Sequence, residues 1–89
     1  MTLLEHFDDW CNTEVESVDR WINRTNFCRT KSDIRQAREN SIQRIFGIAM
    51  FIQTLDNTPT FEQIDAIDAR YNFWREKVEN LCELRLTTL

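Results

Sequence analysis

Residues 59–81 read PTFEQIDAIDARYNFWREKVENL, and the spacing of the apolar residues in this stretch decides the fold. They recur every three or four residues, which keeps their side chains on one side of an α-helix. Thr60 with Gln63 forms a capping box, a signature of a helix start. Pro59 disfavours helical backbone in the residue before it, so the preceding helix must end earlier. The stretch predicts a helix over residues 60–86. Its apolar seam consists of Ile64, Ile67, Tyr71, Trp74, Val78 and Leu81.

Two further helices are predicted from the same kind of pattern. The first begins with a second capping box at Thr2 and covers residues 2–24. The middle helix covers residues 32–56, with Ser32 or Thr30 as its N-cap. The first helix is expected to line the core with Leu4, Phe7, Val18 and Ile22.

These three segments predict an all-α fold in a single domain, residues 1–89. The chain has one Gly and one Pro, whereas a sheet protein of this size needs several such turn residues. Because short connections make neighbouring helices antiparallel, we expect an elongated antiparallel three-helix bundle. The alternative is a helical hairpin with a third helix, completed by a second copy of the chain as a homodimer.

The sequence disfavours membrane and secreted classes of protein. The longest apolar run, residues 45–52, is too short to cross a membrane, and the first residues lack the basic and apolar parts of a signal peptide. Three cysteines without a Cys-x-x-Cys motif fit a reducing compartment, so we expect a cytoplasmic protein. Cys28 and Cys82 fall at the same end of the expected bundle, where a disulfide between them is conceivable.

The motifs of common enzyme classes are also missing from the sequence. There is no glycine-rich phosphate loop and no Ser-His-Asp arrangement, and the single histidine, His6, has no partners at zinc-ligand spacing. Glu76 and Glu79 form a Glu-x-x-Glu pair, but no matching acidic pair lies on a second helix. We therefore expect no enzyme activity, no catalytic residues, no cofactor and no metal.

Charge is sorted along the chain. Residues 1–19 carry six acids and no Lys or Arg, residues 20–44 carry seven bases and two acids, and residues 45–89 carry seven acids and four bases. In an antiparallel bundle this order predicts two ends of opposite sign. The acidic end would hold Glu5, Asp8, Asp9, Asp56, Glu62, Asp65 and Asp68. The basic end would hold Arg20, Arg24, Arg29, Lys31, Arg35 and Arg38.

Concentrated charge of one sign steers a protein towards partners of the opposite sign. The preferred hypothesis is a small acidic protein-binding module, an inhibitor or adaptor whose acidic end meets a basic partner protein. One form of it is a phage-type inhibitor that blocks a basic nucleic-acid-handling protein in the host cytoplasm. The alternative is a nucleic-acid-associated protein that uses the basic end. The solvated charges of an ordinary helical bundle are the third interpretation.

Apolar side chains on the middle helix exceed what its core stripe needs. Phe46 and Met50 lie off one side of that stripe and Phe51 lies off its other side, so either the neighbouring helices or a second copy must cover them. We predict self-association through these three residues.

Glu14 interrupts the apolar stripe of the first helix, and a carboxylate there must be paired, protonated or exposed at the helix edge. Its expected neighbours are Arg44 on the middle helix and Tyr71 or Arg75 on the third. The interpretations are a structural ion pair, exposure, or a catalytic carboxylate.

Overall fold

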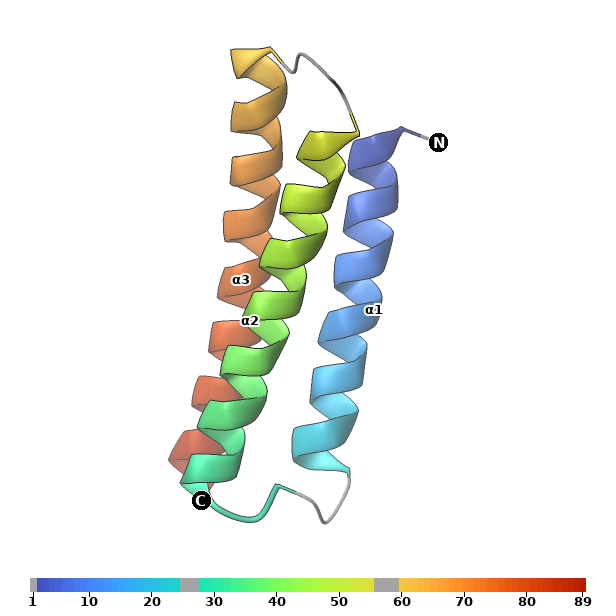
Figure 1. Cartoon of the computed structure of the whole chain (residues 1–89). Coiled ribbons are helices and arrows are strands. Elements are labelled where there is room, and N and C mark those ends of the chain that lie inside the picture. Colours follow the sequence, from blue (N-terminus) through green and yellow to red (C-terminus); the bar gives the residue numbers. More distant parts are fainter. Residues whose placement is uncertain (1, 25–27, 56–59) are drawn as a thin grey trace.

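The computed structural model describes residues 2–24, 28–55 and 60–89, and almost all of them are helical. The helices are α1 (Leu3–Asn23), α2 (Lys31–Thr54) and α3 (Phe61–Thr88), and the described residues contain no strand. In Figure 1 the chain descends along α1, returns along α2 and descends again along α3. The predicted all-α fold of three helices packed on one another is confirmed.

The helix ends differ from the prediction by one or two residues, because the caps decide them. Thr30 rather than Ser32 is the N-cap of α2, so this helix starts at Lys31. It ends at Thr54, two residues early, and the predicted end at Asp56 lies outside the described residues. The third helix continues two residues past the prediction.

Each helix begins after a threonine whose hydroxyl accepts a backbone N–H three residues on. The Thr60–Gln63 capping box has both of its bonds, at 3.2 and 2.8 Å. At the start of α1 the box is only half formed. The Glu5 carboxylate accepts a hydrogen bond from the Thr2 hydroxyl and not from the Thr2 backbone N–H. The threonines therefore satisfy backbone donors that the first turn of a helix leaves without partners.

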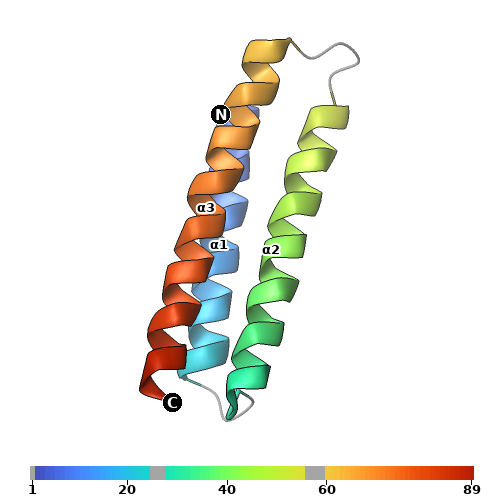
Figure 2. The ribbon, with the colours of Figure 1, turned by 90° about the vertical axis from the view of Figure 1, so that its left-hand side faces the viewer.

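The core runs the length of the bundle, whose principal extents are 45 × 19 × 15 Å. Figure 2 shows the three helices side by side along this length. The predicted seam is buried or packed against the core except for Ile64, which is half-buried, and Leu4 of the first helix is half-buried and packed against the core. The buried residues of the helices are Phe7, Cys11, Val18, Ile22, Ile34, Ser41, Ile45, Ala49, Ile52, Ile67, Trp74, Val78 and Cys82.

Polar contacts tie α1 to each of the other helices. The indole Nε1 of Trp74 donates to Asp8 at 2.8 Å, and Arg85 Nε donates to the carbonyl of Ile22 at 3.2 Å. On the other flank of α1, both Nε and Nη2 of Arg44 bond Glu14 Oε1, at 2.7 and 2.6 Å. These contacts fix the sliding and rotation of α1 against its neighbours.

Candidate interaction surfaces

The acidic end brings together the start of α1, the end of α2 and the start of α3, as Figure 1 shows. A hollow of about 550 Å³ there is lined by all three helices, with Leu4, Ile52 and Ile67 among its walls. The helix ends that carry the predicted acidic residues therefore lie together. Asp56, which the sequence also assigns to this end, lies outside the described residues.

One residue of the acidic end has a structural role. Asp8 accepts the indole N–H of Trp74 and lies 3.7 Å from Arg70 Nε, so its carboxylate is occupied by α3. Asp9 is exposed, and the structure describes no ion pair or side-chain hydrogen bond for it. Asp8 is therefore not one of the acids whose carboxylates are available to a partner.

The acids of α3 form a row along its exposed side. They follow one another mainly at three- and four-residue spacing, the same period as the apolar seam but on a different side of the helix. Over this row the helix rises ~32 Å. Arg75 lies 3.7 Å from Glu79, the one member with an ion pair among the described residues. This acidic row consists of Glu62, Asp65, Asp68, Glu76, Glu79 and Glu83.

Sequence reasoning placed the first three residues of the row at the acidic end and missed that Glu76, Glu79 and Glu83 continue it. The signal was the spacing of the acids, which matches that of the apolar seam. All six are exposed except Glu79, which is half-buried.

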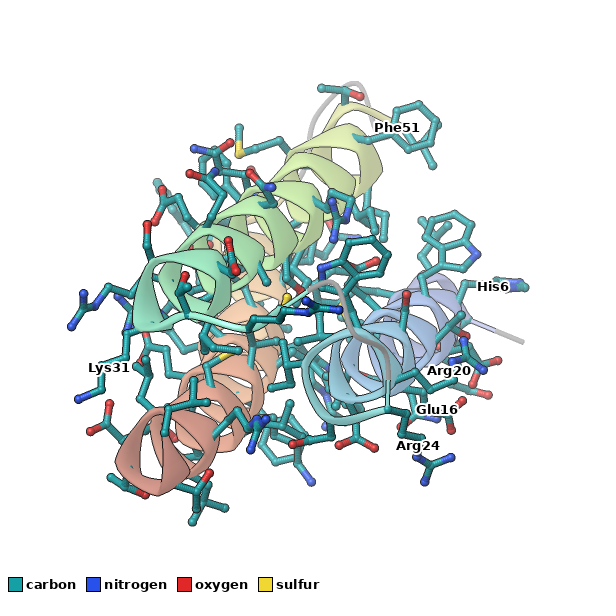
Figure 3. The ribbon with its side chains drawn as sticks, turned by 90° about the horizontal axis from the view of Figure 1, so that it is seen from below. His6, Glu16, Arg20, Arg24, Lys31 and Phe51 are labelled. Atoms are coloured by element: carbon teal, nitrogen blue, oxygen red, sulfur yellow. The ribbon has the colours of Figure 1, made fainter. Side chains whose placement is uncertain are left out.

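The basic end divides into two groups. Figure 3 shows Lys31 on the opposite side of the bundle from Arg20 of α1 and from Arg24, the C-cap of that helix. Lys31, Arg35 and Arg38 line a hollow of about 410 Å³ beside the end of α3, together with Glu83. The backbone N–H of Arg29 donates to Asp33 at 3.0 Å. Bases that are one cluster in the sequence thus face different directions.

The three residues predicted for self-association are exposed, by 51% for Phe46, 42% for Met50 and 55% for Phe51. They do not form one patch. The ring of Phe46 meets Tyr71 of α3 edge-on at 5.7 Å. Phe51 lies ~140° further round α2 because five residues separate the two. Figure 3 shows Phe51 pointing away from α3.

Further exposed apolar side chains lie where α1 adjoins α2. Trp10 and Trp21 of α1 are each 46% exposed, and Leu55, the C-cap of α2, is 53% exposed. Between the Glu14–Arg44 ion pair and the basic end, the two helices leave a hollow of about 260 Å³, with Trp21 in its wall. We call this surface the α1/α2 face. It was missed as a unit, because each helix on its own shows only the edge of an apolar stripe.

The ion pair between Glu14 and Arg44 favours the structural interpretation of Glu14. Its side chain is 17% exposed, and it is held by one of the neighbours expected from the sequence. The contact joins α1 to α2 near the middle of both helices.

The cysteines are free, buried thiols, so Cys28 and Cys82 are not joined. Burial raises the pKa of Cys11 to about 12 and that of Cys82 to about 11. Burial also raises the pKa of Cys28, although a hydrogen bond with the Trp21 side chain acts in the opposite direction. Because the thiolate is the reactive form, these environments suit packing better than nucleophilic chemistry.

Within residues 2–24, 28–55 and 60–89, no group of three or more His, Cys, Asp or Glu side chains is arranged to hold a metal ion. No described helix is long and apolar enough to cross a membrane. Comparisons of the chain with protein-family models, with curated proteins and with solved structures give no match.

Proposed function

We propose that this protein is a non-enzymatic protein-binding module, an inhibitor or adaptor, that presents the acidic row of α3 to a basic surface of a partner protein. The observation that carries the proposal is the exposure of this row. Asp65, Asp68 and Glu76 are exposed, and none of them has an ion pair with another described residue. Their charge is therefore available to a partner.

A row of carboxylates favours one kind of partner. Its members lie mostly ~4.5–6 Å apart along the helix axis. Such a line of negative charge suits a groove that binds a nucleic-acid backbone, which is itself a regular line of negative charge. We therefore propose a nucleic-acid-handling protein as the partner. If a phage encodes the chain, the complex would form in the host cytoplasm, and otherwise in the cytoplasm of the source cell.

The acidic end extends this surface. Glu62 begins the row at that end, and Asp9 adds an exposed carboxylate from α1. Charge of one sign spread over two helices speeds encounter with an oppositely charged surface, and salt screens the effect. Association with the partner should therefore slow as ionic strength rises.

The test compares two triple charge reversals. The first, Asp65→Lys with Asp68→Lys and Glu76→Lys, changes the acidic row and leaves Asp8 in place to hold α1. The matched control, Arg20→Glu with Arg24→Glu and Lys31→Glu, changes three exposed bases. Partners are captured from the native host with the wild type and identified by mass spectrometry. Association rates of the purified partner are then measured at several salt concentrations.

We expect the acidic-row variant to associate at least ~10-fold more slowly and with a flatter salt dependence, since steering contributes factors of this size or more. The control should associate at least as fast as the wild type, because it adds negative charge, and circular dichroism should show both variants folded. If the control loses binding and the acidic-row variant keeps it, the acidic row is not the binding surface.

The second candidate is nucleic-acid binding by the basic end. The observation that favours it is the hollow beside α3, where Lys31, Arg35 and Arg38 come together. Fluorescence anisotropy with labelled single- and double-stranded DNA and RNA distinguishes the candidates. Binding that salt weakens and that Lys31→Glu with Arg35→Glu removes would support this one.

Self-association is a further part of the proposal. The exposed Phe46, Met50 and Phe51 support it, since burying a Phe side chain contributes ~1.5–3 kcal/mol. Gly47 lies between Phe46 and Met50 in the sequence. No atom of the described residues comes within 4 Å of a Cβ built on it, so the space beside it is open. Because Phe46 and Phe51 point in different directions, one dimer contact cannot centre on both.

A further inference from the structure

The α1/α2 face concentrates the large exposed apolar side chains of two helices. Trp10 and Trp21 are eleven residues apart, which places them ~20° apart around α1. Phe51 of α2 and Leu55 at its C-cap are four residues apart, and they are 55% and 53% exposed. Two tryptophans and a phenylalanine on one face are residue types that interfaces favour.

The face is nearly free of net charge in the middle. Glu14 and Arg44 bond each other across it at 2.6 Å, so their charges offset one another. Around α2 the neighbouring exposed residues are neutral: Asn40, Gln43, Gly47, Met50 and Thr54. A strongly charged partner has little to bind here.

We propose that two copies of the chain pair in antiparallel orientation through their α1/α2 faces. The two-fold axis passes near the Glu14–Arg44 ion pair, perpendicular to the helices. This inference rests on the proposed self-association and names its surface.

The shape of the face supports a two-fold axis at that point. Phe51 lies seven residues after Arg44 and Ala37 seven residues before it, so each is ~10 Å from the axis along α2. The hollow of about 260 Å³ lies on the Ala37 side, with Trp21 and Asn40 in its wall. Rotation about the axis brings Phe51 of one copy over this hollow in the other, and the second Phe51 over the first hollow. Such reciprocal contacts define an isologous dimer.

The charge sorting selects the antiparallel orientation. In that arrangement the acidic end of each copy lies beside the basic end of the other, whereas a parallel pair would place like charges together. Opposite potentials facing each other favour association and fix register. Two exposed arginines of the basic end adjoin the face, Arg20 on α1 and Arg24 at its C-cap, and they would then lie near the acids of the partner copy.

The area is also sufficient. α1 and α2 have 21 and 24 residues and are therefore ~31 and ~36 Å long, and each is ~10 Å across. The α1/α2 face therefore measures roughly 600 Å² on each copy, and two such faces together exceed the ~1,000 Å² expected of a specific interface. Because α3 lies on the opposite side, the dimer leaves the acidic row of each copy exposed (Figure 3). Both copies can therefore bind a basic partner at the same time.

Sedimentation equilibrium of the full chain tests the proposal with two matched variants. Phe51→Glu adds a charge on the α1/α2 face, and Phe46→Glu adds the same charge on the α3 side of α2, at similar exposure of 55% and 51%. We expect a wild-type dimer at tens of micromolar, a threshold of ~10⁻⁵ M. Phe51→Glu should raise the dissociation constant at least ~10-fold, and Phe46→Glu should leave it within ~3-fold.

Three other outcomes would each overturn one part of the proposal: self-association, its surface or its orientation. A wild type that stays monomeric at tens of micromolar, above the ~10⁻⁵ M threshold, overturns self-association altogether. A dimer that Phe46→Glu breaks and Phe51→Glu does not overturns the α1/α2 face while self-association stands. Raising salt from ~50 to ~500 mM should weaken an antiparallel dimer by screening its opposed ends, and a dimer that salt strengthens overturns the orientation. None of these outcomes depends on the acidic row, whose role is tested separately by binding to the basic partner.

Discussion

The indole N–H of Trp74 donates to Oδ1 of Asp8 across 2.8 Å, and this bond joins the third helix to the first. Trp74 is only 8% exposed, so its N–H has little access to water if Asp8 is removed. A buried donor left without an acceptor costs about 1–3 kcal/mol. We predict that Asp8→Ala lowers the free energy of unfolding by about that amount.

Urea unfolding followed by circular dichroism measures the effect. Asp9→Ala is the matched control, because Asp9 is exposed and forms no described side-chain contact, so its change should stay within ~0.5 kcal/mol. Equal losses in the two variants would mean that the bond between Asp8 and Trp74 adds nothing beyond ordinary surface charge.

Ser41 is a buried polar residue in the middle of α2. Its side chain is fully buried, and its Oγ has no hydrogen-bond partner in the described structure. Alanine removes the unsatisfied hydroxyl and has a higher helix propensity. Ser41→Ala is therefore expected to raise the free energy of unfolding by about 1 kcal/mol in urea titrations. Ser17→Ala, at an exposed site inside α1 where the structure describes no side-chain hydrogen bond, is the comparison for propensity alone. A destabilised Ser41→Ala would show that the hydroxyl has a partner after all.

The fold could be predicted because its signals are local. The spacing of Ile67, Trp74 and Val78 marks a helical face without reference to any other segment, and the capping box at Thr60 marks its start. Helix ends were less certain because Thr30 and Ser32 are both good N-caps, and only the contact with Asp33 decides between them.

The candidate surfaces depend on neighbours that lie far away in the sequence, and there the prediction was incomplete. Asp8 looks like any acid of the first helix until Trp74 is placed beside it, 66 residues further along the chain. Spacing alone places Phe46 and Phe51 on opposite sides of the core stripe, but only the structure shows that Phe46 contacts Tyr71 and that Phe51 points away from α3. Glu14 was the exception, because a carboxylate inside an apolar stripe needs a partner, and the register of adjacent helices already suggested Arg44.

The buried thiols make stability depend on alkaline pH. Burial raises the pKa of Cys11 from an ordinary value of 9.0 to about 12, so the unfolded chain loses this proton at a lower pH than the folded chain. Above pH 9.0 the unfolded chain has lost the Cys11 proton that the folded chain still holds. A rise in pH therefore favours the unfolded state, and the free energy of unfolding declines. Thermal unfolding from about pH 8 to about pH 11 should show this decline, and Cys11→Ala should make it shallower. An unchanged slope in Cys11→Ala would contradict the assignment to this thiol.

The same thiols should resist modification. At about pH 8 the native protein should react with a thiol reagent only slowly, and all three cysteines should react at once in denaturant. Cys28 should be the fastest of the three in the native state because it alone lies outside the helices. Cys28→Ser is the control, since it should remove the fastest phase and leave the others.

Asp33 makes the start of α2 sensitive to acid. The backbone N–H groups of Arg29 and Thr30 donate to its carboxylate at 3.0 and 3.1 Å, and these bonds lower its pKa below the ordinary value of 3.8. A carboxylate whose pKa is lowered by folding stabilises the folded state above the unfolded pKa. That contribution is lost as pH falls through the lower, folded pKa. Asp33→Ala should therefore melt at a lower temperature than the wild type at neutral pH, and the gap should close below pH 3.8. Melting curves from about pH 7 to about pH 2 measure the gap, with Ser32→Ala as an uncharged control in the same turn. A gap of constant size across this range would show that the two backbone bonds do not depend on the charge of Asp33.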